Sequence, residues 1–298
     1  MKTIQFFLRA VMLSFVAITL INAQGASVED STGLPGDNFS LQGALEMFKQ
    51  AGSPEEFEKL INTEDNNVNN IDLNGDGDID YIRVVGKMDK EVHAFALQVP
   101  VSETENQDIA VIELEKTGEA AAMLQIIGDE DIYGERTIVE PDGGGDDDEE
   151  ADDNGDGGGP RNNDNSHDGY YAPRIVVNVW LWPSVRFVYG PSYTVWVSPW
   201  KWRVYPVWWR PWRPLAWRVF HPFRLRYRSG FAVVRTHRVV HAHTLYAPAR
   251  TTSATVRTRH HASVTHYRVT KSTTIKAKSG GTKVKATRKT TRGGKKRR

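Results

Sequence analysis

Oxygen-bearing side chains recur at alternate positions in one short stretch, Asp-Leu-Asn-Gly-Asp-Gly-Asp-Ile-Asp. A calcium ion takes oxygen ligands at about 2.3–2.6 Å, and this spacing turns alternate oxygens toward one centre. The glycine at the sixth position suits the sharp turn that such a loop needs. We therefore predict a calcium site, in which the residue at the seventh position, Asp78, binds through its backbone carbonyl. The predicted ligands are Asp72, Asn74, Asp76, Asp78 and Asp80.

The stretch resembles the calcium loop of EF-hands and, more closely, the D-x-D-x-D-G-x-x-D loops of FG-GAP and similar extracellular repeats. This local resemblance implies Ca²⁺ as a cofactor that stiffens the loop. It differs from the EF-hand in two ways: position 12 is Arg83 instead of a bidentate Glu, and the flanks at 68–71 and 81–85 favour strands. Without that Glu we expect weak affinity. A metal-free turn of Asn, Asp and Gly is the alternative interpretation.

All nine tryptophans lie between Trp180 and Trp217, interleaved with arginine and proline. The prolines exclude a long helix, and alternation at 176–182 and 193–197 favours short strands. Amphipathic aromatic rings beside cations suit an anionic lipid surface or polymer. The alternative is that the rings pack into a core. The predicted surface residues are Trp196, Trp202, Trp208, Trp209, Arg210, Arg213 and Arg218.

Two pairs of histidines, His241 with His243 and His260 with His261, offer nitrogen ligands for transition metals. Alternate positions of a strand share a face, so His241 and His243 would point the same way if the chain were extended. The sequence places no cysteine and no acid beside them. Scattered polar histidines are therefore the favoured interpretation.

The elements that would position these residues lie mainly between residues 38 and 140. Ser40 is a predicted helix cap, and residues 53–56 (Ser-Pro-Glu-Glu) form a capping box that begins a second helix. After Asn70 the apolar residues favour strands instead. We predict an α+β domain in which two helices precede a small antiparallel sheet that includes a calcium-type hairpin.

The net charge of +1 conceals a strong segregation of charge along the chain. Residues 24–168, which we call the acidic half, carry 8 basic and 37 acidic residues, a net charge of −29. Residues 169–298, the basic half, carry 28 basic residues and no acid. Such halves must attract each other or outside partners of opposite charge. We therefore expect an anionic envelope polymer or lipid surface as partner, with self-association through the two halves as a second expectation.

The N-terminus resembles a secretory signal peptide: two cations, an apolar run at 11–21 and a small residue, Ala23. The apolar run has eleven residues, whereas a helix needs about 20 to span a bilayer. Absence of cysteine excludes disulfides and thiolate chemistry. We expect export, to the periplasm, the outer membrane or the outside, and so no physiological DNA partner.

The chain as a whole also resembles secreted bacterial proteins that combine an N-D-G hairpin with a Trp-Arg-Pro-rich C-terminal segment, a resemblance that implies no particular activity. Composition divides it into five parts. They are a signal peptide (1–23), the α+β domain (38–140), an acidic disordered linker (141–168), an aromatic and basic β-like segment (169–250) and a largely disordered basic tail (251–298).

The sequence contains none of the common catalytic signatures: no G-x-S-x-G, no H-E-x-x-H, no phosphate-binding glycine loop and no cysteine. We therefore expect no enzyme. The interpretation we favour is an exported, envelope-associated protein in which a calcium-stiffened module presents the basic aromatic segment to anionic surfaces. The alternative is a periplasmic metal-binding or metal-responsive protein that uses the acidic linker and the histidines.

Overall fold

The computed structural model describes residues 31–143 and 176–279. The predicted signal peptide, all but the first three residues of the predicted acidic linker and the last 19 residues of the chain lie outside this part. The described residues of both halves belong to one compact unit. Within it, no helix has the length and the apolar composition needed to cross a membrane.

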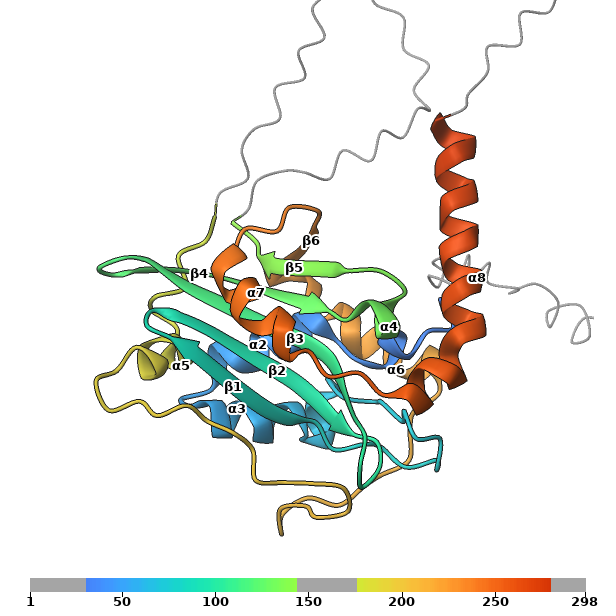
Figure 1. The fold of residues 1–298 in the computed structure, drawn as a ribbon, viewed down its shortest axis with the longest axis horizontal. Coiled ribbons are helices and arrows are strands. Elements are labelled where there is room, and N and C mark those ends of the chain that lie inside the picture. The colour runs from blue at the N-terminus through green and yellow to red at the C-terminus, as the bar shows by residue number, and fades with distance from the viewer. Residues whose placement is uncertain (1–30, 144–175, 280–298) are drawn as a thin grey trace, which may run out of the picture. The chain divides into compact units, whose positions relative to one another are not determined.

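A six-stranded antiparallel sheet lies at the centre of the fold, and its strands follow one another in sequence order (Figure 1). Five strands come from the acidic half and the sixth from the basic half. The helices together with this sheet confirm the α+β class. The strands are β1 (Arg83–Asp89), β2 (Val92–Pro100), β3 (Asn106–Gly118), β4 (Ala121–Gly128), β5 (Thr137–Pro141) and β6 (Phe231–Val234).

Two helices, α2 (Leu41–Gln50) and α3 (Pro54–Ile61), cover one face of the sheet. Both begin where the sequence predicted them. The Ser40 hydroxyl accepts a hydrogen bond from the Gly43 N–H at 3.0 Å, and that of Ser53 accepts one from Glu56 at 3.1 Å. Aromatic rings fill the layer between helices and sheet. This face therefore holds the main hydrophobic core.

The opposite face of the sheet is covered by a short helix of the basic half, α7 (Val240–Tyr246) (Figure 1). It packs over β2, where Ala94 and Ala96 leave room for it. Successive residues of a strand point to opposite faces, so Glu113 and Glu115 of β3 face α7 while Ile112 faces the main core. Carboxylates that are buried in this way require partners.

The rest of the basic half differs from the prediction. Among its described residues, 176–279, only β6 is a strand, and 193–197 contributes one isolated bridge, between Val197 and Val85. Residues 254–279 are helical, where the sequence favoured a largely disordered tail. Contacts with the acidic half replace local pairing: Arg268 donates to the Gly134 carbonyl at 2.6 Å. The remaining helices are α4 (Glu130–Tyr133), α5 (Pro183–Val188), α6 (Trp217–Leu225) and α8 (Ala254–Ser279), with 3-10 turns at Pro35–Asn38, Glu64–Asn66, Arg228–Gly230 and Ala247–Ala249.

Candidate functional site

The predicted calcium residues form one loop, residues 72–80, which we call the acidic loop. The Asp72 carboxylate accepts hydrogen bonds from the N–H groups of Gly75, at 2.6 Å, and Gly77, at 2.9 Å. Gly77 has a φ of +85°, which glycine adopts without strain, so the chain turns sharply where the sequence predicted it. The loop leads into β1, and one backbone hydrogen bond, from Asp80 to Ile71 at 2.8 Å, joins its ends.

The fifth predicted ligand, Asp80, is buried. Its carboxylate accepts hydrogen bonds from the Leu73 N–H at 2.6 Å and the Asn74 side-chain amide at 2.9 Å. Burial, with the neighbouring charges of Asp72 and Asp76, raises the pKa of Asp80 to about 7. Three carboxylates that repel one another favour a cation nearby.

Arginines from the basic half supply part of that positive charge. The Arg213 Nε lies 3.7 Å from an oxygen of Asp78, and Arg259 donates a hydrogen bond to the Leu73 carbonyl at 2.7 Å. A groove of about 330 Å³, lined in part by Asp72 and His260, opens beside the loop. Solvent ions therefore reach the acidic loop, where they would compete with arginine side chains.

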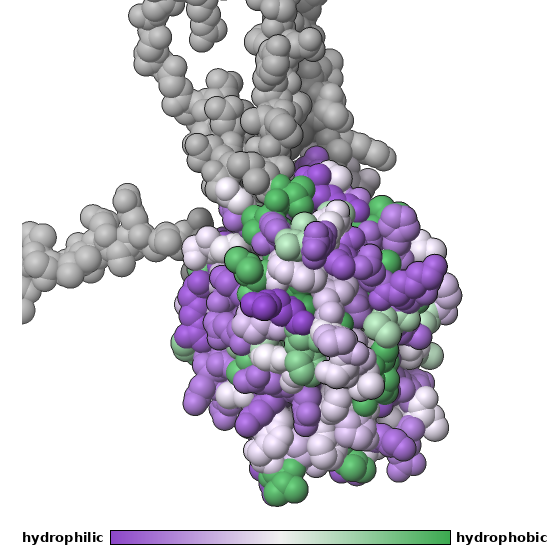
Figure 2. Space-filling view, turned by 90° about the vertical axis from the view of Figure 1, so that its left-hand side faces the viewer, coloured by the Kyte–Doolittle hydropathy of each residue, from purple (hydrophilic) through white to green (hydrophobic). Residues whose placement is uncertain are grey.

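Residues 201–210, which we call the tip loop, extend from the fold beyond the ends of the strands (Figure 1). Lys201 and Val204 exchange two backbone hydrogen bonds across a tight turn. Val207 is 88% exposed and Trp208 is 46% exposed. Figure 2 shows green, hydrophobic residues among purple and white ones at the same lower end of the molecule.

The base of the tip loop is fixed. Trp209 is only 2% exposed, and its ring meets the edge of the Tyr81 ring at a centroid distance of 5.1 Å. The Ile79 N–H of the acidic loop donates to the Trp212 carbonyl at 2.8 Å. Asn70 and Leu215 exchange two hydrogen bonds, at 2.7 and 2.9 Å. The tip loop therefore packs through Trp209 against a residue that flanks the acidic loop, and the segment directly after the tip loop is hydrogen-bonded to the acidic loop and to its other flank.

The residues predicted to bind anionic surfaces divide into two groups. Trp196 and Trp209 pack inward, and the Trp196 indole N–H donates to the buried Glu58 at 3.3 Å. Trp208, Arg210, Arg213 and Arg218 are exposed, and Trp202 is half-buried beneath the Arg203 guanidinium. The aromatic segment is thus partly core and partly surface.

A cluster of one glutamate and two histidines lies under α7. The two oxygens of Glu113 contact His237 Nε2 at 2.6 Å and His243 Nδ1 at 2.7 Å. Glu113 is fully buried, and the two imidazole rings meet edge to face at a centroid distance of 4.8 Å. Within the described ranges, this is the group of three acid or histidine side chains whose ligand atoms all lie within 4.8 Å of one another.

Further charges surround this cluster. Glu115 accepts a hydrogen bond from the Ala242 N–H at 2.8 Å and contacts His241 Nδ1 at 3.0 Å. Burial raises the pKa of Glu113 to about 8, although the charge of Arg136 opposes that rise. Burial likewise lowers the pKa values of His237 and His243. The cluster is thus a desolvated site in which burial favours the uncharged form of each of the three groups.

Sequence reasoning missed this cluster for two reasons. His241 and His243 lie on helix α7 instead of a strand, so they contact different glutamates. The expectation that no acid lies nearby is wrong in the fold, because β3 supplies Glu113 from a position 130 residues away in sequence. Burial patterns offer one signal: glutamates that alternate with Ile and Leu in a central strand require partners.

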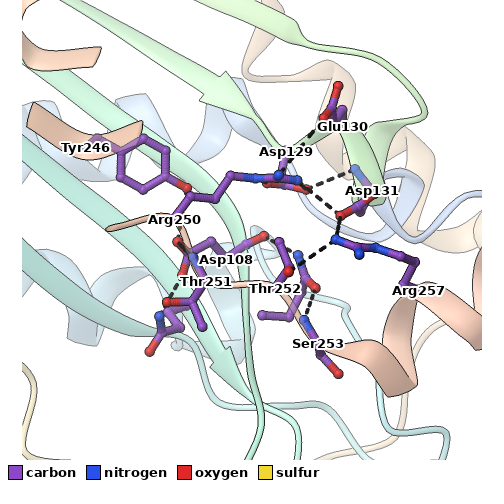
Figure 3. Close-up of polar contacts among 12 residues, drawn as sticks. Asp108, Asp129, Glu130, Asp131, Tyr246, Arg250, Thr251, Thr252, Ser253 and Arg257 are labelled. Carbon is purple, nitrogen blue, oxygen red and sulfur yellow. Dashed lines mark hydrogen bonds and ion pairs between the residues drawn. The ribbon is translucent and has the colours of Figure 1, made fainter. Parts of the chain in front are cut away.

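Ion pairs also join the two halves elsewhere. Figure 3 shows Arg250 between Asp129 and Asp131, close to the Tyr246 hydroxyl, which donates to Asp108 at 3.0 Å. Arg238 reaches Glu140 at 3.3 Å. In the part of the chain that the structure describes, the opposite charges of the halves are therefore used at least partly within one molecule.

No protein-family model, curated protein sequence or solved structure matches this chain. The likeness of the acidic loop to FG-GAP loops remains a local resemblance. Functional conclusions therefore depend on the geometry of the sites described above.

Proposed function

We propose that this chain is an exported, non-catalytic protein that binds anionic lipid surfaces through its tip loop. The observation that carries the proposal is the exposure of Val207 and Trp208 at the end of a loop that also carries Lys201, Arg203 and Arg210. Exposed apolar side chains gain free energy when they enter a bilayer interface. The cations can meet anionic headgroups at the same depth.

The attachment of the tip loop supports this proposal. Trp209 in the core and the hydrogen bond from Ile79 to Trp212 hold the base of the loop in one conformation. A loop ordered before binding loses less conformational entropy when it binds. We further propose that Ca²⁺ in the acidic loop strengthens this support, because the acidic loop contacts the segment directly after the tip loop.

The sequence supports an extracytoplasmic surface over nucleic acid as the partner. Residues 1–23 have the pattern of a signal peptide, and no acidic residue occurs from Gly169 to Arg298 to repel an anionic surface. The proposed location is the cell envelope, in the periplasm, at the outer membrane or outside the cell.

Vesicle co-sedimentation of residues 24–298 tests the proposal. Binding is compared between phosphatidylglycerol and phosphatidylcholine vesicles, for the natural chain, Val207→Ser and Trp208→Ala. We expect anionic vesicles to be preferred and each substitution to weaken binding about tenfold, because each removes apolar area that would be buried. The slope of affinity against salt should stay unchanged, because no charge is lost.

Val233→Ser is the matched control, since Val233 is an exposed valine on β6. If Val233→Ser weakens binding as much as Val207→Ser, or if neither tip substitution has an effect, the tip loop is not the binding surface. Binding to lipopolysaccharide with no binding to phosphatidylglycerol vesicles would show that the partner is an anionic polymer and not the proposed lipid bilayer.

A metal-binding function that uses histidines is favoured by a separate observation, the Glu113 cluster. The acidic linker that the same alternative invokes lies almost entirely outside the described residues.

A further inference from the structure

Three ligand atoms of different segments converge beneath α7. Glu113 belongs to β3, His237 precedes α7 and His243 lies on it. Glu113 lies far from the two histidines in the sequence, and the three residues come together only in the fold. There the imidazole rings of His237 and His243, both from the basic half, contact the carboxylate of Glu113 on the sheet. A buried carboxylate held between two histidines is the donor set of many transition-metal sites.

We propose that Glu113, His237 and His243 bind one divalent transition-metal ion of the zinc class, with a fourth position open to water. This site is independent of the tip loop and of the acidic loop. Two imidazole nitrogens and one carboxylate match the ligands that Zn²⁺ accepts when one coordination position remains open.

Small ring movements suffice to form the site. Around a tetrahedral zinc ion, with bonds of about 2.0–2.2 Å, neighbouring ligand atoms lie about 3.4 Å apart. The nitrogen-to-oxygen contacts of Glu113 measure 2.6 and 2.7 Å, so each imidazole must move outward by under about 1 Å. The side chains of His237 and His243 are 16% and 26% exposed, which leaves room for that movement and a path for the ion.

The surrounding groups favour a divalent transition ion. Glu113 loses its proton when it binds a metal ion, and together with Glu115 it then brings two negative charges against the one positive charge of Arg136. A hydrogen bond to the Val239 backbone orients the His237 ring, as outer partners do for metal-binding histidines. Nitrogen ligands select zinc-class ions over Ca²⁺ and Mg²⁺, which prefer oxygen.

Isothermal titration of residues 24–298 with zinc chloride tests this inference, with cobalt absorption as the second readout. Each of His237→Gln and His243→Gln should weaken binding at this site by at least about 100-fold, because even outer partners of metal ligands contribute about 10–100-fold. Cobalt bands of a four-coordinate site should disappear in both variants. Weaker sites elsewhere in the chain appear equally in every variant and cancel in the comparison.

His241→Gln is the matched control, because His241 lies on the same helix and contacts Glu115 instead of Glu113. It should retain the affinity and the cobalt spectrum of the natural chain. Near-ultraviolet circular dichroism checks that each variant is folded. If a histidine variant is not folded, Glu113→Gln, which keeps the shape of the side chain, is used in its place. The proposal is overturned if the natural chain binds zinc no more tightly than the His237→Gln/His243→Gln double variant, or if His241→Gln loses as much affinity as His243→Gln.

Discussion

Both carboxylate oxygens of Asp129 accept hydrogen bonds from Arg250, at 2.5 Å from Nε and 2.9 Å from Nη2 (Figure 3). The Asp129 side chain is 3% exposed, so its charge has little contact with water. Burial raises the pKa of Asp129, and the guanidinium opposes that rise. Arg250 thereby attaches the segment after α7 to the acidic half.

Replacement of Arg250 by Met should lower the free energy of unfolding by about 3–5 kcal/mol, because Asp129 would be left as a buried charge without its partner. Urea unfolding of residues 24–298 at neutral pH measures the loss. Arg257→Met is the control: Arg257 pairs with Asp131 at 3.2 Å but is exposed, and its loss should cost under about 1 kcal/mol. Equal costs in the two variants would contradict the prediction.

Calcium should raise the melting temperature of the same chain, because it relieves the repulsion among Asp72, Asp76 and Asp80. At ten times the dissociation constant, the stabilisation should be about 1.4 kcal/mol. Asp76→Ala should abolish the rise, and Asp65→Ala, an exposed acid outside the loop, should preserve it. Differential scanning calorimetry with and without Ca²⁺ makes the comparison, and no calcium effect in the natural chain would reduce the loop to a turn.

Stability should fall in acid through His93, a buried histidine of β2 whose ring nitrogens have no hydrogen-bond partner. Burial lowers its pKa to about 4 from 6.5. A depressed folded-state pKa gives stability that is complete above pH 6.5 and is lost as the pH falls toward 4. By pH 4 the loss from this group should be about 2–3 kcal/mol.

His93→Leu should remove that part of the pH dependence and leave the stability at pH 7 similar, because Leu suits the surrounding rings of Phe95, Tyr189 and Tyr193. Urea unfolding of both chains between pH 7 and pH 4 gives the difference. A parallel decline in both chains would show that other groups cause the acid effect.

Local signals in the sequence were sufficient for the two helices of the acidic half and for its sharp turn, but residues 68–71, which were expected to be a strand, form none. Ser40 and Ser53 mark their helices through capping, and Gly77 marks its turn through its need for positive φ. The alternation of apolar and polar residues at 176–182 predicted a strand that does not form, because these residues are bonded to the acidic half in another way. The Asn178 side chain, for example, accepts a hydrogen bond from the Ala122 N–H at 3.1 Å. A repeating pattern does not specify which distant segment will satisfy it.

The candidate sites show the same limit. The acidic loop consists of nine consecutive residues, so it could be recognised from the local sequence alone. Glu113 and His243 meet only because α7 returns to β3, and their distance in sequence removes any local signal. The aromatic segment was ambiguous for a physical reason: the neighbouring residues Trp208 and Trp209 have the same chemistry but opposite environments.

The pairing of β5 with β6 also sets an order of events during synthesis. Residues 137–141 are made about ninety residues before the strand that covers their free edge. That edge stays without its partner strand until the residues of β6 are available. The residues made next are the acidic run from Asp142 to Asp168. Their like charges would repel a second copy of the same run near that edge.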